Sequence, residues 1–325
     1  MKKVLITTVP FADTNNSIEL LESANLSYYI NPLNRKLSAN ELKEMIYEYD
    51  ALIAGTEEIN SEVIASAENL KIISRVGVGL DSVDLNAAKD KNIIVTYTPD
   101  APAPAVAELT VSNIFSLLRG SHLSNLMMHQ KRWERIFGRR ITEVTIGIIG
   151  LGRIGTMVVK LLSALGASRI LVNDLSKDKD IEPNLRIEWV DKEVIYKQSD
   201  VISIHVPLTK LTKDMITRKE LRMMKDNALL INTARGGIIN EHDLENALRN
   251  MTIGGAAIDC FDNEPYDGPL SEIESCLLTS HMGSMSIDCR NRMEVEATME
   301  VIRYFSGEDL KNIVPNSEYT MHKGG

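Results

Sequence analysis

Three chemically active side chains follow apolar, strand-like segments in the second half of the chain. Arg235 follows "LLINTA", Glu264 stands in "AAIDCFDNEP", and His281 ends "CLLTSH". An arginine can hold a carboxylate with two hydrogen bonds, and a histidine carries protons at neutral pH. A carboxylate beside that histidine would favour its charged form. Because ligands of open parallel sheets collect at the carboxyl ends of the strands, we expect the three side chains to share one site.

The segment "GIIGLGRIG" contains Gly150, Gly152 and Gly155 with the spacing GxGxxG. In such a motif the first glycine makes a tight turn, the second admits a pyrophosphate, and the third packs helix against strand. A strand-like segment precedes it, and a helical pattern follows whose N-terminus would face the phosphates. Asp174 comes about 20 residues later, at the place where proteins with this motif carry an acid that binds the ribose hydroxyls. These features together predict a dinucleotide site, and favour it over a glycine turn that serves packing alone.

Taken singly, each of the three side chains has a plainer interpretation. A strand-end Arg or Glu is usually a solvated loop charge, and a single His can be a hydrogen-bonded structural residue. Their order after a dinucleotide-binding loop favours a catalytic site instead.

The elements that must position these residues alternate between apolar strands and helical patterns. The first hundred residues contain strand-like segments at "VLITT", "LSYYI", "ALIAG", "LKIISRV" and "NIIVTYT". Ser38 and Glu41 form a capping box before one helix, and Thr217 and Glu220 form another. A proline-rich segment over 98–105 precedes a long helix, and a second series runs through "VTIGIIG", "RILVND", "DVISIHV", "ALLINTA", "GGAAIDCF" and "CLLTSH". This alternation predicts two α/β domains with parallel sheets, followed by a last helix from about Ser286 to Phe305.

Composition limits the classes of function. The chain has 325 residues and a net charge of −9, which disfavours nucleic acid as a partner. One basic run, "KRWERIFGRR" over 131–140, is interpreted as a solvated helix face and turn. The start "MKKVLITTVP" reads as a first strand rather than a signal peptide, and no stretch suggests a membrane span. Three cysteines without a CxxC pair fit reduced thiols in the cytoplasm, and six scattered histidines predict no metal site.

Seven segments spread over nearly the whole chain carry a resemblance to a known family. They are "SRVGVGLDSVDL", "PAVAELTVSNIFSLLR", "GIIGLGRIG", "HVPLT", "INTARGG", "AAIDCFDNEP" and "LTSHMGS". In order and spacing they are similar to the D-isomer-specific 2-hydroxyacid dehydrogenases. The resemblance implies a Rossmann cofactor domain, 101–288, inserted into a flavodoxin-like substrate domain, 1–100 plus 289–325, with the site between them. It further implies NAD as cofactor, a 2-hydroxy or 2-keto acid as substrate, and a homodimer formed through the cofactor domain.

The family's roles are carried over onto the matching residues. Arg235 would bind the substrate carboxylate and polarise the carbonyl, His281 would be the acid/base, and Glu264 would raise the pKa of His281. Asp259 would hold the nicotinamide amide, while Val76 and Gly77 would offer backbone N–H groups to the carboxylate. The expected cofactor-binding residues are Gly150, Gly152, Arg153, Ile154, Gly155, Asp174, His205, Val206, Pro207, Thr212, Thr233, Ala234 and Asp259. The acid at Asp174 favours NAD over NADP, because its charge would repel a 2′-phosphate.

The identity of the acid depends mainly on Arg75, which precedes the expected carboxylate loop. The resemblance to the family's 3-phosphoglycerate dehydrogenase branch favours 3-phosphoglycerate and 3-phosphohydroxypyruvate as the substrate pair and implies that Arg75 contacts the phosphate; the alternative is a side chain that points to solvent. Glyoxylate, hydroxypyruvate, sugar-acid and other 2-keto acid reductases remain alternatives. Ser280 replaces the proline that the family usually has before the histidine, and Met282 and Met285 follow the histidine. These departures concern the wall of the substrate pocket, so they bear on the identity of the substrate and not on the reaction class. A partner-recruiting corepressor of the same fold is disfavoured by the intact Arg, Glu and His.

Overall fold

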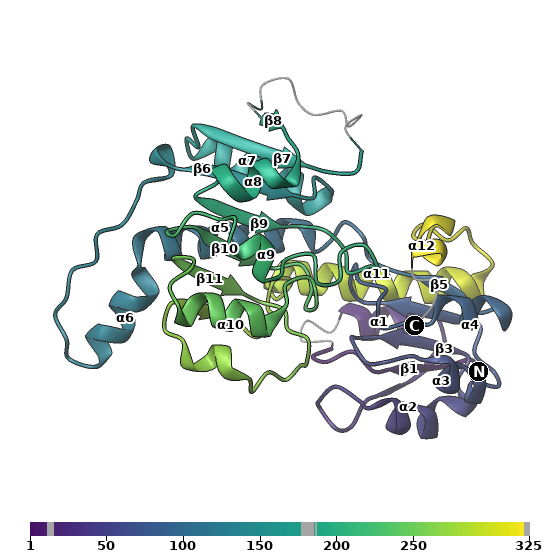
Figure 1. The fold of residues 1–325 in the computed structure, drawn as a ribbon. Coiled ribbons are helices and arrows are strands. Elements are labelled where there is room, and N and C mark those ends of the chain that lie inside the picture. The colour runs from purple at the N-terminus through teal and green to yellow at the C-terminus, as the bar shows by residue number, and fades with distance from the viewer. Residues whose placement is uncertain (12–15, 177–184, 186, 322–325) are drawn as a thin grey trace. The chain divides into compact units, whose positions relative to one another are not determined.

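The computed structural model describes residues 1–11, 16–176, 185 and 187–321. The chain divides into two compact units. Unit 1 comprises Met1–Pro102 with Met285–Gly325, and unit 2 comprises Ala103–Ser284. The division predicted from the sequence placed the boundaries at 100 and 288, against Pro102 and Ser284 here. Each unit is built around its own parallel sheet (Figure 1).

The described part of unit 1 contains a five-stranded parallel sheet in the order β2-β1-β3-β4-β5. The strands are β1 (Lys3–Ile6), β2 (Ser27–Ile30), β3 (Ala51–Ala54), β4 (Ile72–Arg75) and β5 (Ile94–Thr96). This order is that of flavodoxin-like sheets, as predicted. The central strands β3 and β4 are buried throughout, because helices cover both of their faces.

Three helices with a short 3-10 turn pack on one face of this sheet, and two helices pack on the other. The first group is α2 (Ala39–Met45), η1 (Ile46–Glu48), α3 (Ser61–Ser66) and α4 (Leu85–Asp90); the second is α1 (Asn16–Ser23) and α11 (Ile287–Ser306). The capping box before α2 is confirmed, since Ser38 Oγ accepts from the N–H of Glu41 at 3.3 Å. On the other face Ser74 Oγ donates to the carbonyl of Ala297 at 2.8 Å. The last long helix therefore belongs to unit 1 although unit 2 separates it from β1–β5 in the sequence.

Unit 2 contains, among its described residues, a seven-stranded parallel sheet in the order β12-β11-β10-β9-β6-β7-β8. The strands are β6 (Thr145–Ile149), β7 (Arg169–Asn173), β8 (Ile187–Trp189), β9 (Val201–Ile204), β10 (Leu229–Asn232), β11 (Gly255–Ile258) and β12 (Cys276–Leu278). This is the doubly wound Rossmann order with one further strand, and the order reverses between β6 and β9. Strand β8 was not expected from the sequence, because its three residues at the sheet edge carry no clear apolar run.

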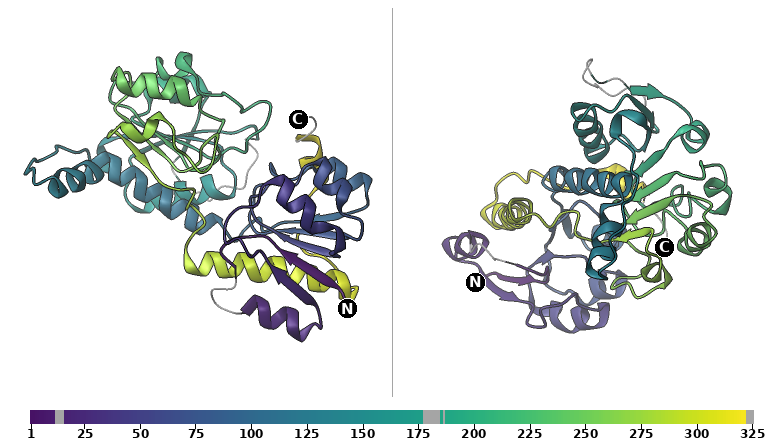
Figure 2. Two further views of the ribbon diagram at one scale, coloured as in Figure 1. Left: turned by 90° about the horizontal axis from the view of Figure 1, so that it is seen from below. Right: turned by 90° about the vertical axis from the view of Figure 1, so that its left-hand side faces the viewer.

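Two apolar cores cover the faces of the unit 2 sheet. Alternate residues of each strand serve opposite cores, as Ile148 and Ile149 of β6 do. The helices of this unit are α5 (Ala103–Arg119), α6 (Ser121–His129), α7 (Arg153–Ala164), α8 (Lys192–Gln198), α9 (Arg218–Leu221) and α10 (Glu241–Arg249), with 3-10 turns η2 (Ile141–Glu143) and η3 (Pro269–Glu272). Helices α5 and α7 pack together on one face, and α8 and α10 lie on the other (Figure 2). The capping box at Thr217 and Glu220 is confirmed, but the helix it begins is a single turn.

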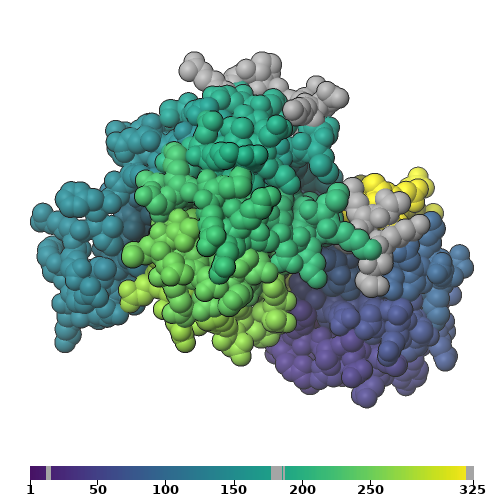
Figure 3. Space-filling model, in the orientation of Figure 1, coloured from purple at the N-terminus to yellow at the C-terminus, as the bar shows by residue number. Residues whose placement is uncertain are grey.

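An arm formed by residues 121–140 projects from the body of unit 2 (Figures 1 and 3). It consists of α6, in which no residue is buried, and an extended return segment. The basic run over 131–140 lies in this return segment, so the prediction of a helix face there was wrong, although the run is largely exposed. Trp133 is 78% exposed and Phe137 fully exposed. The arm therefore presents aromatic and basic side chains that its own unit does not cover.

The longest helices are α5 and α11. Neither of them, nor any other helix in the described part of the chain, has the length and apolar character needed to cross a membrane. A last short helix, α12 (Asn316–Met321), belongs to unit 1.

Candidate active site

The glycine loop joins β6 to α7 at the point where the strand order reverses. Gly150 has a φ of +97°, and a Cβ there would lie 2.5 Å from the carbonyl oxygen of His205. A Cβ at Gly155 would lie 2.1 Å from the carbonyl oxygen of Gly150. Both positions therefore require glycine for reasons internal to the protein.

Gly152 differs from these two glycines. It is the N-cap of α7, and a Cβ there would meet nothing within 4 Å. Open space in front of a helix N-terminus, where the first-turn N–H groups have no partner inside the helix, is the cradle that a pyrophosphate occupies in dinucleotide-binding folds. Arg153 and Ile154 form the first turn behind it. These residues fit the phosphates of a nicotinamide dinucleotide.

Asp174 follows β7 and is bonded to the glycine loop. One carboxylate oxygen accepts from the N–H of Leu151 at 2.6 Å, and the other accepts from the N–H of Ser176 at 3.0 Å. The acid therefore lies beside the phosphate cradle, where the motif places the group that binds the ribose hydroxyls.

Of the remaining expected cofactor residues, Asp259 follows β11 and the others lie on loops that follow β9 and β10. His205 Nε2 lies 2.9 Å from Ser203 Oγ, and burial lowers the pKa of His205 to about 3, so its ring is neutral. Thr212 Oγ1 donates to the carbonyl of Pro207 at 2.6 Å and thereby closes the loop after Val206. Thr233 Oγ1 lies 2.7 Å from Thr110 Oγ1 of α5, which fixes the backbone just before Ala234.

Arg235 lies in a tight loop three residues beyond β10, rather than at the strand end itself. The side chain of Asn232 holds this loop from both sides: its amide donates to the carbonyl of Arg235 at 2.7 Å, and its oxygen accepts from the N–H of Ala234 at 3.0 Å. A Cβ at Gly236 would lie 2.1 Å from the backbone of Phe261. The Arg235 loop is therefore packed directly against the loop that carries Glu264.

His281 and Glu264 form a direct pair. His281 Nδ1 lies 2.9 and 2.8 Å from the two carboxylate oxygens of Glu264. Burial lowers the pKa of His281, but hydrogen bonding and charge from Cys260 and Glu264 outweigh it and raise that pKa to about 10. The imidazolium form is therefore favoured at neutral pH, with Nδ1 committed to Glu264 and Nε2 left for proton transfer.

The backbone of the histidine loop is unusual. His281 has a φ of +50°, in the left-handed region that costs a residue with a side chain about 1 kcal/mol or more. The buried carboxylate of Asp259 secures the loop by accepting from Thr279 Oγ1 and from the N–H groups of Met282 and Gly283, at 2.6 to 2.9 Å. Asp259 is only 1% exposed, so its visible task is to hold the histidine loop.

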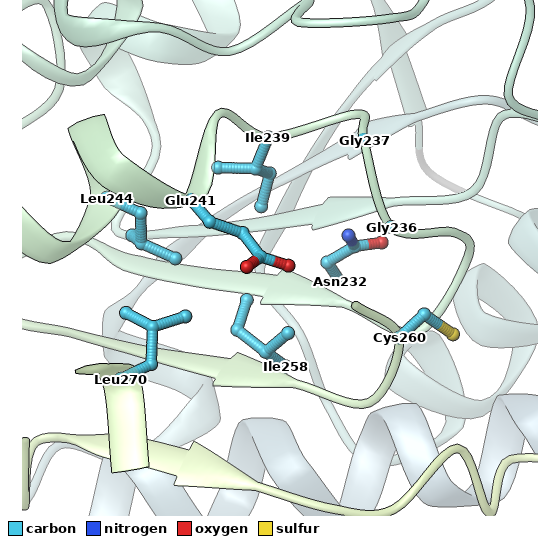
Figure 4. A pocket seen from close by; sticks show the side chains of 9 residues that line it. All are labelled: Asn232, Gly236, Gly237, Ile239, Glu241, Leu244, Ile258, Cys260 and Leu270. Atoms are coloured by element: carbon cyan, nitrogen blue, oxygen red, sulfur yellow. The ribbon is translucent and has the colours of Figure 1, made fainter. Parts of the chain in front are cut away.

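A small pocket in unit 2 is lined by residues that include Glu241, Gly236 and Cys260 (Figure 4). Glu241 of α10 points into it, and its carboxylate accepts from the N–H of Asp262 at 2.7 Å. Burial raises the pKa of Glu241, and the nearby Asp262 and Glu264 carboxylates add to the effect. Phe261 N–H in turn donates to a Glu264 oxygen at 3.1 Å. The turn that presents Glu264 is therefore also held by the Glu241 carboxylate, through the N–H of Asp262.

Sequence reasoning missed Cys260 and Asn232. Cys260 stands between Asp259 and Glu264 and lies next to His281: single ligand-type atoms of Cys260, Glu264 and His281 all lie within 4.8 Å of one another. Its position immediately after an acid at the end of an apolar strand was the available signal. Asn232 ends the strand before Arg235, and only the structure reveals its bracing bonds.

The turn over Arg75–Gly77 lies in unit 1, at the carboxyl end of β4. The N–H of Val76 donates to the carbonyl of Ala54 at 2.9 Å, and the N–H of Gly77 donates to Thr98 Oγ1 at 2.8 Å. The two N–H groups expected to be open for a carboxylate are therefore engaged within unit 1. Arg75 is 5% exposed, and its guanidinium donates to the carbonyl of Val76. It does not point to solvent.

A dinucleotide cradle, an arginine loop and a histidine–carboxylate pair at the carboxyl edge of one parallel sheet define a nicotinamide-dependent oxidoreductase. The model of the family described as D-isomer specific 2-hydroxyacid dehydrogenase, NAD binding domain, matches residues 111–283. The chain belongs to this family, and it is an NAD-dependent D-2-hydroxyacid dehydrogenase.

Individual relatives agree on the family and differ in substrate. The chain is 38% identical over 283 residues to a glyoxylate reductase of Thermofilum pendens, which covers 83% of each chain. It is 36% identical over 284 residues to a D-3-phosphoglycerate dehydrogenase of Methanocaldococcus jannaschii, covering 86% of this chain but only 54% of that protein. Among solved structures, D-lactate dehydrogenase from Aquifex aeolicus, in complex with NAD and lactic acid, superposes with a TM-score of 0.86 at 26% identity, covering 96% of this chain and 98% of that one.

Proposed function

We propose that the enzyme reduces a small unphosphorylated 2-keto acid, glyoxylate or hydroxypyruvate, to the corresponding 2-hydroxy acid, which is the D-isomer for hydroxypyruvate, and catalyses the reverse oxidation. The observation that carries the reaction is the His281–Glu264 pair, with Nδ1 2.8 Å from the carboxylate. NADH supplies the hydride when it is bound. His281 delivers the proton to the substrate oxygen from Nε2, and Glu264 stabilises the imidazolium before transfer.

Arg235 is proposed to bind the substrate carboxylate and polarise the adjacent carbonyl. Its loop is braced by Asn232 and packed at Gly236 against the Glu264 loop. A planar guanidinium held in this way suits two-point binding of a carboxylate. Asp259 secures the His281 loop, and its expected contact with the nicotinamide amide remains a proposal. Val76 and Gly77 are retained as proposed substrate-binding residues, and a carboxylate would have to take the N–H of Val76 or Gly77 from its present partner. Arg75 would contact the substrate only if that substrate were phosphorylated.

The preference for an unphosphorylated acid is supported by the state of Arg75. A phosphate dianion needs an accessible cation, and Arg75 is buried with its guanidinium over its own turn. Of the two relatives, the glyoxylate reductase also has the higher identity, 38% against 36%. 3-Phosphoglycerate, which the sequence favoured, is the second candidate, because an arginine does stand beside the proposed substrate turn.

The test is a substrate panel followed at the NADH absorbance band. Glyoxylate, hydroxypyruvate, pyruvate and 3-phosphohydroxypyruvate are compared by kcat/KM with the same enzyme preparation. Glyoxylate or hydroxypyruvate should rank first. A first place for 3-phosphohydroxypyruvate would reverse the substrate assignment while leaving the reaction class intact, and no turnover with any 2-keto acid would refute the mechanism.

We further propose that the chain is a homodimer formed by the arm over 121–140. The arm exposes Trp133 and Phe137, and large uncovered aromatic side chains are typical of interface anchors. Its basic segment, with five Lys or Arg against one Glu, opposes the net charge of −9 of the chain. A second copy of this acidic protein is therefore a complementary partner. Three free thiols are in keeping with a reducing, cytoplasmic location, which we also propose.

A further inference from the structure

Cys260, Glu264 and His281 form a compact cluster of three different ligand types in unit 2. A sulfur, a carboxylate oxygen and an imidazole nitrogen lie within 4.8 Å of one another, and Cys260 is buried. It is the one cluster of its kind found among the described residues. The proton transfer proposed above uses His281 and Glu264, and the thiol neither gives nor takes a proton in it.

We propose that this cluster is an inhibitory binding site for a thiophilic divalent cation such as Zn²⁺. Thiolate, imidazole and carboxylate are the three protein ligands that zinc accepts, at bond lengths of about 2.0–2.3 Å. Tetrahedral geometry with such bonds separates ligand atoms by about 3.3–3.8 Å. Two side-chain rotations would satisfy this geometry. One moves the Cys260 sulfur toward His281 and Glu264, and the other lengthens the contact of 2.8 Å between His281 Nδ1 and the Glu264 carboxylate. A solvent molecule would supply the fourth ligand.

The surroundings of Cys260 favour its recruitment. The sulfur donates a long hydrogen bond of 3.6 Å to the carbonyl of Ala234 and already interacts with His281, so turning it toward the cluster gives up little. In Figure 4 the sulfur lies on the side of the residue away from the Glu241 carboxylate. Glu241 is held by the N–H of Asp262 and is not needed as a ligand.

Binding changes no oxidation state and is balanced by proton release. The thiol of Cys260 and Nδ1 of His281 each lose a proton to solvent, and the cation takes their place between the three ligands. Glu264 then no longer supports an imidazolium, because its charge is used by the cation. His281 can no longer cycle between its charged and neutral forms, so hydride and proton transfer stop together. This consequence for turnover rests on the proposed function, whereas the binding does not.

The first measurement detects the metal without any reaction. Metal-free enzyme, without cofactor or substrate, is titrated with Co²⁺ as a spectroscopic substitute for Zn²⁺, and thiolate-to-metal charge-transfer absorption is recorded. About one ion per chain should produce this band. Cys260→Ser should abolish it, whereas Cys276→Ser, which changes another buried free thiol of unit 2, should leave it unchanged. Absence of the band in the parent enzyme, or its persistence in Cys260→Ser, would overturn the proposal.

The second measurement is inhibition by Zn²⁺ and its reversal by EDTA. Each enzyme's inhibited rate is expressed relative to its own zinc-free rate, because Cys260 contributes to the raised pKa of His281. In Cys260→Ser the zinc concentration for half-inhibition should rise by roughly 10–100-fold or more. Loss of a residue that only supports a metal ligand already costs that much in metal affinity. Cys260→Ala is the second variant if the serine is poorly tolerated, with thermal unfolding as the check on folding. Equal zinc sensitivity of parent and Cys260 variants would refute the site. If the enzyme shows the Co²⁺ band but reduces no 2-keto acid, the binding site stands and the proposed function fails.

Discussion

The guanidinium of Arg75 lies over Gly77, so that a Cβ at Gly77 would come within 2.7 Å of Arg75 Nη1. Gly77 has a φ of +142°, and the same guanidinium donates to the carbonyl of Val76. The positive charge is therefore used inside the turn that it was expected to serve. This relationship turns Arg75 from a candidate phosphate ligand into a candidate brace of the substrate turn.

Arg75→Ala should impair reduction of glyoxylate and of 3-phosphohydroxypyruvate by similar factors, because the loss loosens the turn rather than removing a phosphate contact. Leaving the Val76 carbonyl without its donor should cost about 1–3 kcal/mol of unfolding free energy. Steady-state kinetics with both acids and urea unfolding measure the two effects. A loss confined to the phosphorylated acid, with unchanged stability, would instead restore the phosphoglycerate assignment.

His281→Asn should lower kcat by roughly 10²–10⁴-fold, the usual contribution of a positioned acid or base. The affinity for NADH should hardly change, since the cofactor cradle is built from the β6–α7 loop and Asp174. Stopped-flow binding and single-turnover reduction separate the two quantities. His242→Asn, at an exposed histidine of α10, is the matched control and should behave like the parent. A variant that loses NADH binding in proportion to kcat would contradict the assigned role.

Glu264→Gln should shift the pH dependence of reduction to lower pH. Glu264 helps to raise the pKa of His281 to about 10, and reduction requires the protonated ring. Without the charge that pKa falls, so the variant should approach parental kcat/KM at low pH and lose activity earlier as the pH rises. Oxidation of the hydroxy acid, which needs the neutral ring, should show the opposite trend. Profiles in both directions test the pairing, and identical profiles for parent and variant would disprove it.

NADH should be preferred to NADPH, because the Asp174 carboxylate beside the glycine loop would repel a 2′-phosphate. Asp174→Asn keeps an oxygen that can accept from the Leu151 N–H but removes the charge. We expect the NADH-to-NADPH ratio of kcat/KM to fall by about tenfold, equivalent to about 1.4 kcal/mol. A parent enzyme that uses both cofactors equally, or an unchanged ratio in the variant, would show that Asp174 does not select the cofactor.

Replacing Trp133 and Phe137 together by serine should convert a dimer into a monomer. Truncated aromatic anchors usually cost about 2 kcal/mol or more each at an interface. Sedimentation velocity of parent and variant at equal concentration gives the result. Replacing Leu175, another exposed apolar residue of unit 2 that lies outside the arm, is the control and should leave the mass unchanged. A monomeric parent enzyme would refute the dimer itself.

Local patterns in the sequence were sufficient for most of the fold. The two capping boxes, the glycine motif and the alternation of strands with helices each depend on residues a few positions apart, so they can be read without tertiary contacts. The edge strand β8 was not predicted, because its three residues are too few to show the alternation of apolar and polar residues that is typical of a strand. The basic run was misassigned because charge alone does not distinguish a helix face from an extended arm.

By itself the sequence determined the family, the cofactor class and the order of Arg235, Glu264 and His281 along the chain, because these depend on motifs at fixed spacing. Only the tertiary structure decided which atoms meet. The φ of +50° at His281 turns its ring so that Nδ1 reaches Glu264, and Gly236 lets the Arg235 loop touch the backbone of Phe261. The same packing brings Cys260 beside the pair and commits the Val76 N–H to Ala54. Side-chain direction in a loop follows from backbone dihedrals and from neighbours distant in sequence, and a linear pattern does not encode them.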